Sequence, residues 1–454
     1  MDDTSQRLEE VTLAPLRRTG RGYYLLVLVL LIVIGIGLYA YYTQLAQGLT
    51  VTGMAPTVNK IIWGLYITNF VFFIGISHAG TLISAILRIS NAGWRTPVTR
   101  MAEFITVVAL SVGALFVIID LGRPDRVLNL IRFGRWQSPI LWDFFAISTY
   151  LVGSLIYLYL PLIPDLATCR DKLSKQISGP KRWFYRTLAL GWTGAPDQRR
   201  NLVVALTLMM LIIIPVAISV HTVVSWIFGM TLRTGWNSTV FGVYFVAGAI
   251  FSGTATLIIV MAVLRRIYHL EEYITQKHFV YLGYMLAALG LIMVYFNLSE
   301  FITMGYKLEE GEPVYLNQIF TGAFAPLYWF YAGGLLLPGL VVLLPWTRGI
   351  WGVLAAAVIV DVGMWFERYI IVVASLRVPQ MPYTNLADYF PSGVEIAITA
   401  GAFALFALLI AIFVKLVPVI SIWEVREQIE GMTERAPAAL RPAESTGAEP
   451  VAGS

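Results

Sequence analysis

The chain has 454 residues, of which 58% are hydrophobic and only 13% are charged, and its formal net charge is +5. This composition excludes an ordinary soluble domain and indicates a protein that crosses a membrane several times. The single cysteine, Cys169, excludes a disulfide framework and a cysteine-ligated iron–sulfur cluster or zinc site within the chain. Only four histidines are present, two of them in a polar connection, so we expect no haem. We also expect no bound metal and no nucleic-acid partner.

Ten segments are long and apolar enough to cross a bilayer, which takes about 20 residues at a rise of about 1.5 Å each. The first follows Arg17, Arg18 and Arg21 and lacks a cleavage pattern, so we expect an uncleaved span rather than a signal peptide. The sequence therefore predicts an all-α polytopic fold with about ten transmembrane helices. The predicted spans are 23–42, 62–88, 103–121, 140–162, 201–228, 240–264, 279–303, 326–345, 350–375 and 395–418.

Two halves of the chain match weakly. Residues 113–121 align with 290–298, which places Asn297 opposite Asp120. Four spans per unit predict two four-helix bundles related by an axis along the membrane normal, with the first and last spans peripheral. The predicted divisions are a cytoplasmic tail (1–22), a first peripheral helix with its loop (23–59), a first bundle holding the principal site (60–228), a second bundle (229–378), a last peripheral helix (379–423) and a disordered cytoplasmic tail (424–454).

The distribution of lysine and arginine predicts the orientation. With the N-terminus inside, the inner segments hold 23 of these residues and the outer loops hold 8, so both termini are expected in the cytoplasm. The outer loop 122–139 is an exception, because it holds four arginines against one carboxylate, Asp125. Two interpretations remain open, namely contact with lipid phosphates and docking of an extracytoplasmic partner.

Ionisable side chains inside spans are functional-site hypotheses, because each costs several kcal/mol to bury in lipid. His78 lies in the second span, and Asp120 ends the third. Small, polar or aromatic candidates for the same site are Gly80, Thr81, Arg123, Trp142, Asp143 and His221. Candidates for a proton path are Glu103, Asp143, Asp361, Glu367 and Arg368.

A histidine and a carboxylate in an apolar cleft suit the oxidation of a quinol. Each group holds one hydroxyl oxygen of the head group and takes a proton as the electrons leave. An apolar cleft takes the isoprenoid tail, and small residues let the ring approach a helix backbone. We therefore predict that His78 and Asp120 are catalytic and that a quinone such as menaquinone binds as substrate.

Each candidate also has a structural interpretation. His78 serves a neighbouring helix as a hydrogen-bonding partner, and Asp120 caps its helix or pairs with Arg123. Asp143 opens a helix, where a carboxylate is favourable. Glu367 and Arg368 form a buried pair that neutralises itself.

At these residues the chain resembles the NrfD family, the membrane subunits of polysulfide reductase and related complexes. The segments that carry the resemblance are F-F-I-G-I-S-H-A-G-T-L-I-S-A, I-D-L-G-R-P and S-P-I-L-W-D, and they are most similar to ActC-type subunits of alternative complex III. The resemblance implies an eight-helix core without cofactors that binds a quinone, with His78 and Asp120 as quinone-site residues. It also implies an extracytoplasmic iron–sulfur protein, multihaem cytochromes c and a second NrfD-like subunit as partners in a bacterial inner membrane.

The sequence thus predicts a quinol-oxidising membrane subunit of an electron-transfer complex, inactive alone. A first alternative is a cofactor-free anchor or a quinone-reducing subunit of a polysulfide or molybdopterin-type reductase. A more remote alternative is a secondary transporter, which usually breaks helices at the midplane in both repeats. The second and sixth spans show no such paired break.

Overall fold

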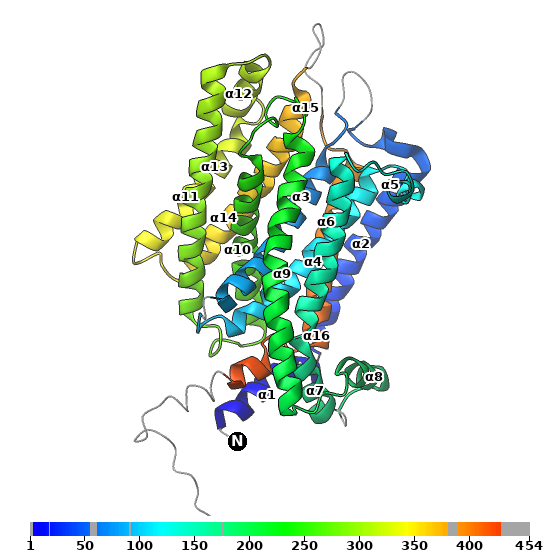
Figure 1. Cartoon of the computed structure of the whole chain (residues 1–454), viewed down its shortest axis with the longest axis vertical. Coiled ribbons are helices and arrows are strands. Elements are labelled where there is room, and N and C mark those ends of the chain that lie inside the picture. Colours follow the sequence, from blue (N-terminus) through cyan, green and yellow to red (C-terminus); the bar gives the residue numbers. More distant parts are fainter. Residues whose placement is uncertain are drawn as a thin grey trace, which may run out of the picture.

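The computed structural model describes residues 3–17, 19–54, 61–89, 92–173, 176–379 and 389–427. Within these ranges the protein is helical and holds ten helices that are long and apolar enough to cross a membrane, as predicted (Figure 1). Of the predicted C-terminal tail (424–454), residues 424–427 are helical and residues 428–454 lie outside the described residues.

The ten long helices overlap the ten predicted spans. They are α2 (Arg21–Gln47), α3 (Leu65–Ile89), α4 (Thr96–Asp120), α6 (Pro139–Tyr159), α9 (Pro196–Gly229), α10 (Phe241–Ile267), α11 (Gln276–Lys307), α13 (Ala325–Leu343), α14 (Ile350–Tyr369) and α16 (Gly393–Leu416). A π-helical segment, η3 (Ile370–Ala374), continues α14 into α15 (Ser375–Arg377).

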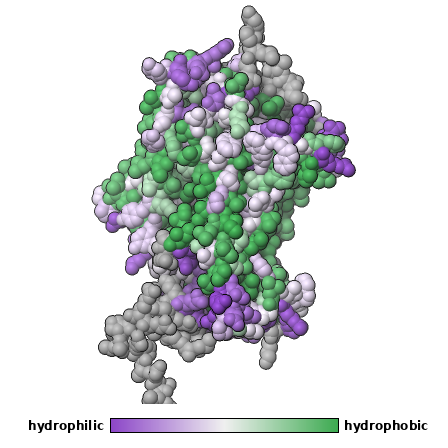
Figure 2. Space-filling model, viewed as in Figure 1, coloured by the Kyte–Doolittle hydropathy of each residue, from purple (hydrophilic) through white to green (hydrophobic). Residues whose placement is uncertain are grey.

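Shorter helices lie at the two ends of the long ones. One end carries α1 (Asp3–Arg17), α7 (Leu162–Leu173), α8 (Gly179–Leu188) and the segment 417–427, and we call it the terminal face (Figure 1). The opposite end, the loop face, carries η1 (Gly48–Val51), η2 (Pro124–Arg126), α5 (Asn129–Arg132) and α12 (Glu312–Phe320). Figure 2 shows polar residues gathered at both ends and an apolar band between them, the surface expected of a membrane protein.

The helices differ strongly in how far they are enclosed. In α3, 94% of the most apolar stretch is buried, whereas in α2 the share is 11%. Helix α3 packs against α4, α9 and α10, and α6 packs against α4 and α9. Helices α10, α11, α13 and α14 pack around one another, and α2 and α16 form a pair at the edge. The spans of the two predicted bundles correspond to α3–α4–α6–α9 and α10–α11–α13–α14, and α3 also packs against α10 across them, so the repeat stays a prediction.

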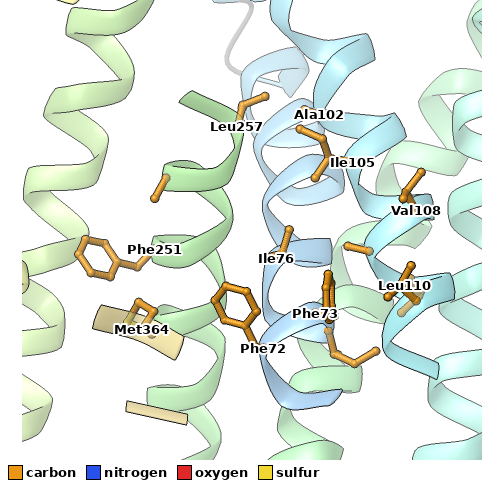
Figure 3. Close-up of a cluster of buried hydrophobic side chains, with 14 of the residues drawn as sticks. Phe72, Phe73, Ile76, Ala102, Ile105, Val108, Leu110, Phe251, Leu257 and Met364 are labelled. Atoms are coloured by element: carbon orange, nitrogen blue, oxygen red, sulfur yellow. The ribbon is translucent and has the colours of Figure 1, made fainter. Parts of the chain in front are cut away.

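The core around α3 is built from close apolar contacts (Figure 3). Phe72, Phe73 and Ile76 of α3 are almost fully buried between α4 and α10. Lipid tails are as apolar as these side chains, so van der Waals packing rather than removal from water holds such helices together. Small residues allow this packing. A side chain on Gly80 would overlap the carbonyl oxygen of Ala102 and the hydroxyl of Thr106, so glycine is required where α3 crosses α4.

Buried ion pairs and hydrogen bonds join the segments of the terminal face, and we call this group the terminal-face clamp. The guanidinium of Arg100, 2% exposed, pairs with the fully buried carboxylate of Asp165 and donates to the carbonyl of Pro161 (2.8 Å) and the hydroxyl of Ser421 (3.1 Å). The carboxylate of Asp165 also accepts from the backbone N–H groups of Ile422 and Trp423. The chain after α16 is thereby attached to α4 and α7.

The predicted N-terminal tail contains a helix in its described part. In α1, Leu13 and Leu16 are 1% and 4% exposed, because their spacing of three places both on one face against the core. The carboxylate of Glu9 pairs with Lys172 and Arg426. This amphipathic helix therefore joins the same clamp.

Candidate functional site

His78 lies in the middle of α3 and is fully buried. Its Nδ1 is 2.9 Å from the carbonyl oxygen of Ile74, and its Nε2 is 2.6 Å from that of Ala217 on α9. A neutral imidazole has one N–H, so it satisfies only one of these two carbonyls, whereas the imidazolium satisfies both. The ring thus bridges α3 and α9 and has two hydrogen-bonding states.

His221 on α9 stands directly against His78, with ring centroids 3.9 Å apart. It is fully buried, and among the described residues neither of its ring nitrogens has a hydrogen-bond partner. A Cβ placed on Gly75 would lie 4.0 Å from Nε2 of His221 and 3.4 Å from Oγ of Ser252, which brings α10 next to the histidines. The structure therefore brings together the two histidines that the sequence proposed for one site.

Polar groups of α4 and α6 surround the helix turn that holds His78. The hydroxyls of Thr106 and Tyr150 both donate to the carbonyl of Ser77, at 2.7 and 3.0 Å. Gly80 lies one turn further along α3 at the crossing with α4. The side chain of Thr81 lies outside the described part of the structure.

Asp120 ends α4 at the loop face. Within the described ranges its Oδ1 is buried and has no hydrogen-bond partner. Next to it, Gln44 donates from Nε2 to the carbonyl of Ile119 (2.9 Å) and accepts from the hydroxyl of Tyr66 (2.6 Å). Within the described ranges, Oδ1 of Asp120 is thus the unpartnered atom of a polar group formed by α2, α3 and α4.

Glu395 on α16 adds a second carboxylate to this region. It is fully buried and accepts from the backbone N–H groups of Gly53 (2.7 Å) and Ser392 (2.9 Å) and from the hydroxyl of Tyr389 (2.6 Å). Sequence reasoning missed Glu395, because Ser392 and Glu395 form a capping box, a pattern that indicates only a helix start. It also missed Gln44 and Tyr66, which carry no charge.

An apolar cavity of about 190 Å³ lies beside Asp120, between α2, α4 and α16. Ile118 and Ile119, the two residues before Asp120, form part of its wall, whereas Asp120 itself follows the wall and does not line it. Leu38 and Leu115 line it and are 63% and 43% exposed, so the cavity opens toward the bilayer. Its wall is completed by Ile34, Gly37, Tyr41, Val112, Phe116, Ile398, Gly401, Ala402 and Leu405.

The structure does not bring His78 and Asp120 together. Thr106 is level with Ser77, beside His78, and Asp120 follows Thr106 by 14 residues along α4. At a rise of about 1.5 Å per residue, the two side chains are separated by about 20 Å along the helix axis. One quinol head group therefore does not reach both side chains, and the prediction that His78 and Asp120 bind the same quinol is wrong.

Arg123, Trp142 and Asp143 also lie at the loop face. Arg123 is exposed and pairs with Asp125 (2.9 Å) rather than with Asp120. The indole of Trp142 donates to the carbonyl of Trp136. Asp143 is 6% exposed, and its Oδ1 has no hydrogen-bond partner among the described residues.

Glu103 belongs to the terminal face. It accepts from the hydroxyl of Ser84 (2.6 Å) and from Arg88 (3.2 Å), and Arg88 also pairs with Glu424 (2.8 Å). Burial raises the pKa of Glu424, but the nearby Arg88 and Arg95 outweigh it, so this pKa lies below its ordinary value. Glu103 is therefore tied to a structural ion network.

Glu367 and Arg368 lie in a buried polar network of the second group of helices. The guanidinium of Arg368 contacts Glu367 (3.2 Å), and Glu367 accepts from the hydroxyl of Tyr244 (2.5 Å). The hydroxyl of Tyr331 is 3.2 Å from that of Tyr244 and accepts from Asn297 (2.8 Å). Sequence reasoning did not find the tyrosines, because aromatic residues near span ends are usually interfacial.

Asp361 lies apart from that network, in the middle of α14. Its Oδ2 accepts from the hydroxyl of Thr256 on α10 (2.7 Å). Within the described ranges, three or more metal-ligating side chains do not gather in any one place.

Comparison of the sequence with known proteins identifies related chains. A profile of the family described as "Polysulphide reductase, NrfD" matches residues 50–380. A Halobacterium salinarum protein, named as a membrane component of a dimethyl sulfoxide reductase, is 27% identical over 92% of this chain and 95% of that protein.

Two further relatives match most of their length. A component of the selenate reductase of Mesobacillus selenatarsenatis is 24% identical, over 85% of this chain and 91% of that protein. The integral membrane subunit of menaquinone reductase from Nitratidesulfovibrio vulgaris is 23% identical, over 85% of this chain and 89% of that protein.

Proposed function

Because the chain belongs to the polysulphide reductase NrfD family, whose profile covers most of its length, we propose that it is the quinol-binding membrane subunit of an electron-transfer complex. The complex is of the alternative complex III type. It oxidises quinol and passes electrons to an extracytoplasmic iron–sulfur protein and on to multihaem cytochromes c. The membrane part also includes a second NrfD-like subunit. The chain acts as a subunit and is inactive alone.

The observation that carries this proposal is the unpartnered carboxyl oxygen of Asp120 beside an apolar cavity that opens to the bilayer. A quinol has an apolar tail and a head group with two hydroxyls, so it matches an apolar cavity next to a hydrogen-bond acceptor. The named menaquinone reductase relative supports the substrate class.

In this proposal, each polar residue around Asp120 has its own role in binding the quinol or accepting its proton. Asp120 accepts the proton of one quinol hydroxyl, and Tyr66 and Gln44 hold polar contacts on the same side. Oxidation of one quinol releases two protons and two electrons. The electrons leave to the iron–sulfur partner, Asp120 releases its proton through the loop face, which we assign to the outside, and the second proton goes to the pair formed by His78 and His221.

His78 has a separate role in this proposal. With His221 it forms a proton-transfer pair about 20 Å inward of Asp120, near the group of Glu367 and Arg368 and the carboxylate of Asp361. Gly80 allows close helix packing at this depth. Arg123, Trp142 and Asp143 border the loop face, where the arginines of loop 122–139 dock the extracytoplasmic partner.

Substitution of Asp120 tests the proposal. General-base help is typically worth about 10²–10⁴-fold, so Asp120→Asn in the purified complex should lower quinol oxidation by at least about 10²-fold. Asp171→Asn, in an exposed pair with Arg170 and away from the loop face, is the control and should retain full turnover. Full activity and an unchanged pH profile of Asp120→Asn, in a normally assembled complex, would remove this carboxyl from the mechanism.

A second candidate is a quinone-reducing subunit or cofactor-free anchor of a reductase. The names of the relatives favour it, since two are subunits of dimethyl sulfoxide and selenate reductases and one of a menaquinone reductase. Identification of the subunits that co-purify with the native complex distinguishes the candidates. A molybdopterin-containing partner without cytochromes c would favour the reductase.

A further inference from the structure

A second apolar cleft, of about 450 Å³, lies between α3, α10, α14 and α16. Aromatic side chains form much of its wall, namely Phe72, Phe73, Trp365, Phe403 and Phe406. Figure 3 shows Phe72, Phe73 and Ile76 on the adjoining part of α3. At the rim, Val358 and Val362 are 44% and 41% exposed, so the cleft opens sideways into the bilayer.

Hydrogen bonds hold the helices around this cleft in place. The indole of Trp365 on α14 donates to Oδ1 of Asn69 on α3 (2.9 Å), and the amide of Asn69 donates to the hydroxyl of Thr399 on α16 (2.8 Å). One buried asparagine thus joins three of the four helices. These hydrogen bonds fix the positions of the helices that form the walls of the cleft.

A carboxyl group lines this otherwise apolar wall. Oδ2 of Asp361 accepts from Thr256, which also lines the cleft, whereas Oδ1 has no hydrogen-bond partner in the part of the chain that the structure describes. Asp361 follows the start of α14 by 11 residues, which places it about 17 Å along the helix and hence near the middle of the bilayer. A carboxyl oxygen without a partner at this depth costs free energy unless a ligand supplies the missing hydrogen bond.

The depth of Asp361 decides which molecule fits. A phospholipid keeps its polar head at the membrane surface, so it brings only acyl chain to this level. A helix of another subunit presents mainly apolar side chains and leaves the carboxyl unpaired. An aromatic diol with an isoprenoid tail enters the apolar interior, stacks on aromatic walls and donates a hydroxyl hydrogen to a carboxyl oxygen.

We propose that the cleft lined by Asp361, Thr256 and the five aromatic residues is a second quinol-binding site, separate from Asp120. It holds a quinol in the membrane interior within reach of the bilayer pool. The ligand class rests on the proposed function, whereas the location rests on the cleft itself. Ser252, one turn from Thr256 on α10, and Nε2 of His221 both lie within about 4 Å of a Cβ placed on Gly75, so the site is about one helix turn from the histidine pair.

Photolabelling of the purified complex in lipid nanodiscs tests this proposal without measuring turnover. The probe is a photoreactive azido-menaquinone, and labelled peptides are identified by mass spectrometry. We expect labelling of α14 and α10 that excess unlabelled menaquinone removes. Asp361→Leu should weaken this labelling by about fivefold, as the loss of one hydrogen bond predicts. Val358→Phe, which fills the cleft, should abolish it.

Val243→Phe is the matched control, because Val243 is 61% exposed on α10 and does not line the cleft. It should leave labelling of α14 unchanged. The proposal is overturned if α14 is not labelled, if a photoreactive phospholipid labels it equally, or if crosslinkers at Val358 capture a helix of another subunit. Labelling of α4 near Asp120 is read separately. Label on α14 alone supports the second site and contradicts the assignment of Asp120.

Discussion

The imidazole rings of His78 and His221 lie with their centroids 3.9 Å apart, and of the two only His78 has hydrogen-bond contacts within the described ranges. Two positive charges 4 Å apart repel by about 4 kcal/mol at an effective dielectric constant of about 20. The pair therefore holds at most one added proton. His78 has carbonyl acceptors for two N–H groups, so it is the member that stabilises that proton.

We expect His221→Leu to separate proton transfer from packing. The substitution removes two buried nitrogens that have no partner among the described residues, so assembly and thermal stability should be retained. Quinol oxidation should fall by about 10²-fold if the pair transfers protons. His269→Asn, in an exposed turn with φ 52°, is the control and should keep full turnover. Unchanged turnover of His221→Leu would limit His221 to a packing role.

Gly80→Ala should destabilise the crossing of α3 and α4. The added methyl group meets the Ala102 carbonyl and the Thr106 hydroxyl, and overpacking of this kind typically costs about 1–3 kcal/mol. Gly35→Ala on α2, where no atom lies within 4 Å of the new Cβ, should have no such effect. Thermal unfolding in one detergent compares the two. Equal melting temperatures would contradict the close approach.

Asp165→Asn should release the terminal-face clamp. It leaves the buried charge of Arg100 without its counter-ion, and breaking a buried ion pair in this way costs about 3–5 kcal/mol. Asp171→Asn, in an exposed pair with Arg170 on the same helix, should cost less than about 1 kcal/mol. Limited proteolysis after α16 and thermal unfolding report the change. Resistance equal to wild type would show that the ion pair does not hold the C-terminal segment.

The lowered pKa of Glu424 predicts how the stability of the folded protein depends on pH. Arg88 and Arg95 hold its pKa below the ordinary value, so its contribution is complete above the unfolded pKa of about 4.3 and is lost as pH falls through the folded pKa. Glu424→Gln should be less stable than wild type at pH 7, and the difference should narrow below pH 4. Melting temperatures across this range measure it. A difference independent of pH would show that the carboxylate contributes by shape and not by charge.

Sidedness is tested by thiol labelling in intact cells. Cys169 is buried, so an introduced cysteine supplies the accessible thiol. A cysteine at Arg132 in the loop face should react with an impermeant reagent from outside, whereas one at Arg182 in α8 should react only after lysis. The reverse pattern would invert the topology and move the Asp120 cavity to the cytoplasmic side.

The elements that were predicted well are those set by composition over many residues. Each of the ten spans is a continuous apolar stretch, and a helix is the structure that satisfies its own backbone groups in lipid. The amphipathic helix α1 was not predicted, because its apolar residues are few and its stability depends on Leu13 and Leu16 packing against the core.

For the site, the sequence alone determined which residues are costly to bury, including His78, Asp120, His221 and Asp361, because charge within an apolar stretch is visible without coordinates. Only the tertiary structure decided which of them meet. Antiparallel packing places Thr106 beside Ser77 and so carries Asp120 about 20 Å from His78, while the contact of α3 with α9 brings His221 to 3.9 Å. Helix register is set by side-chain packing between distant segments, and residue type along one chain does not reveal it.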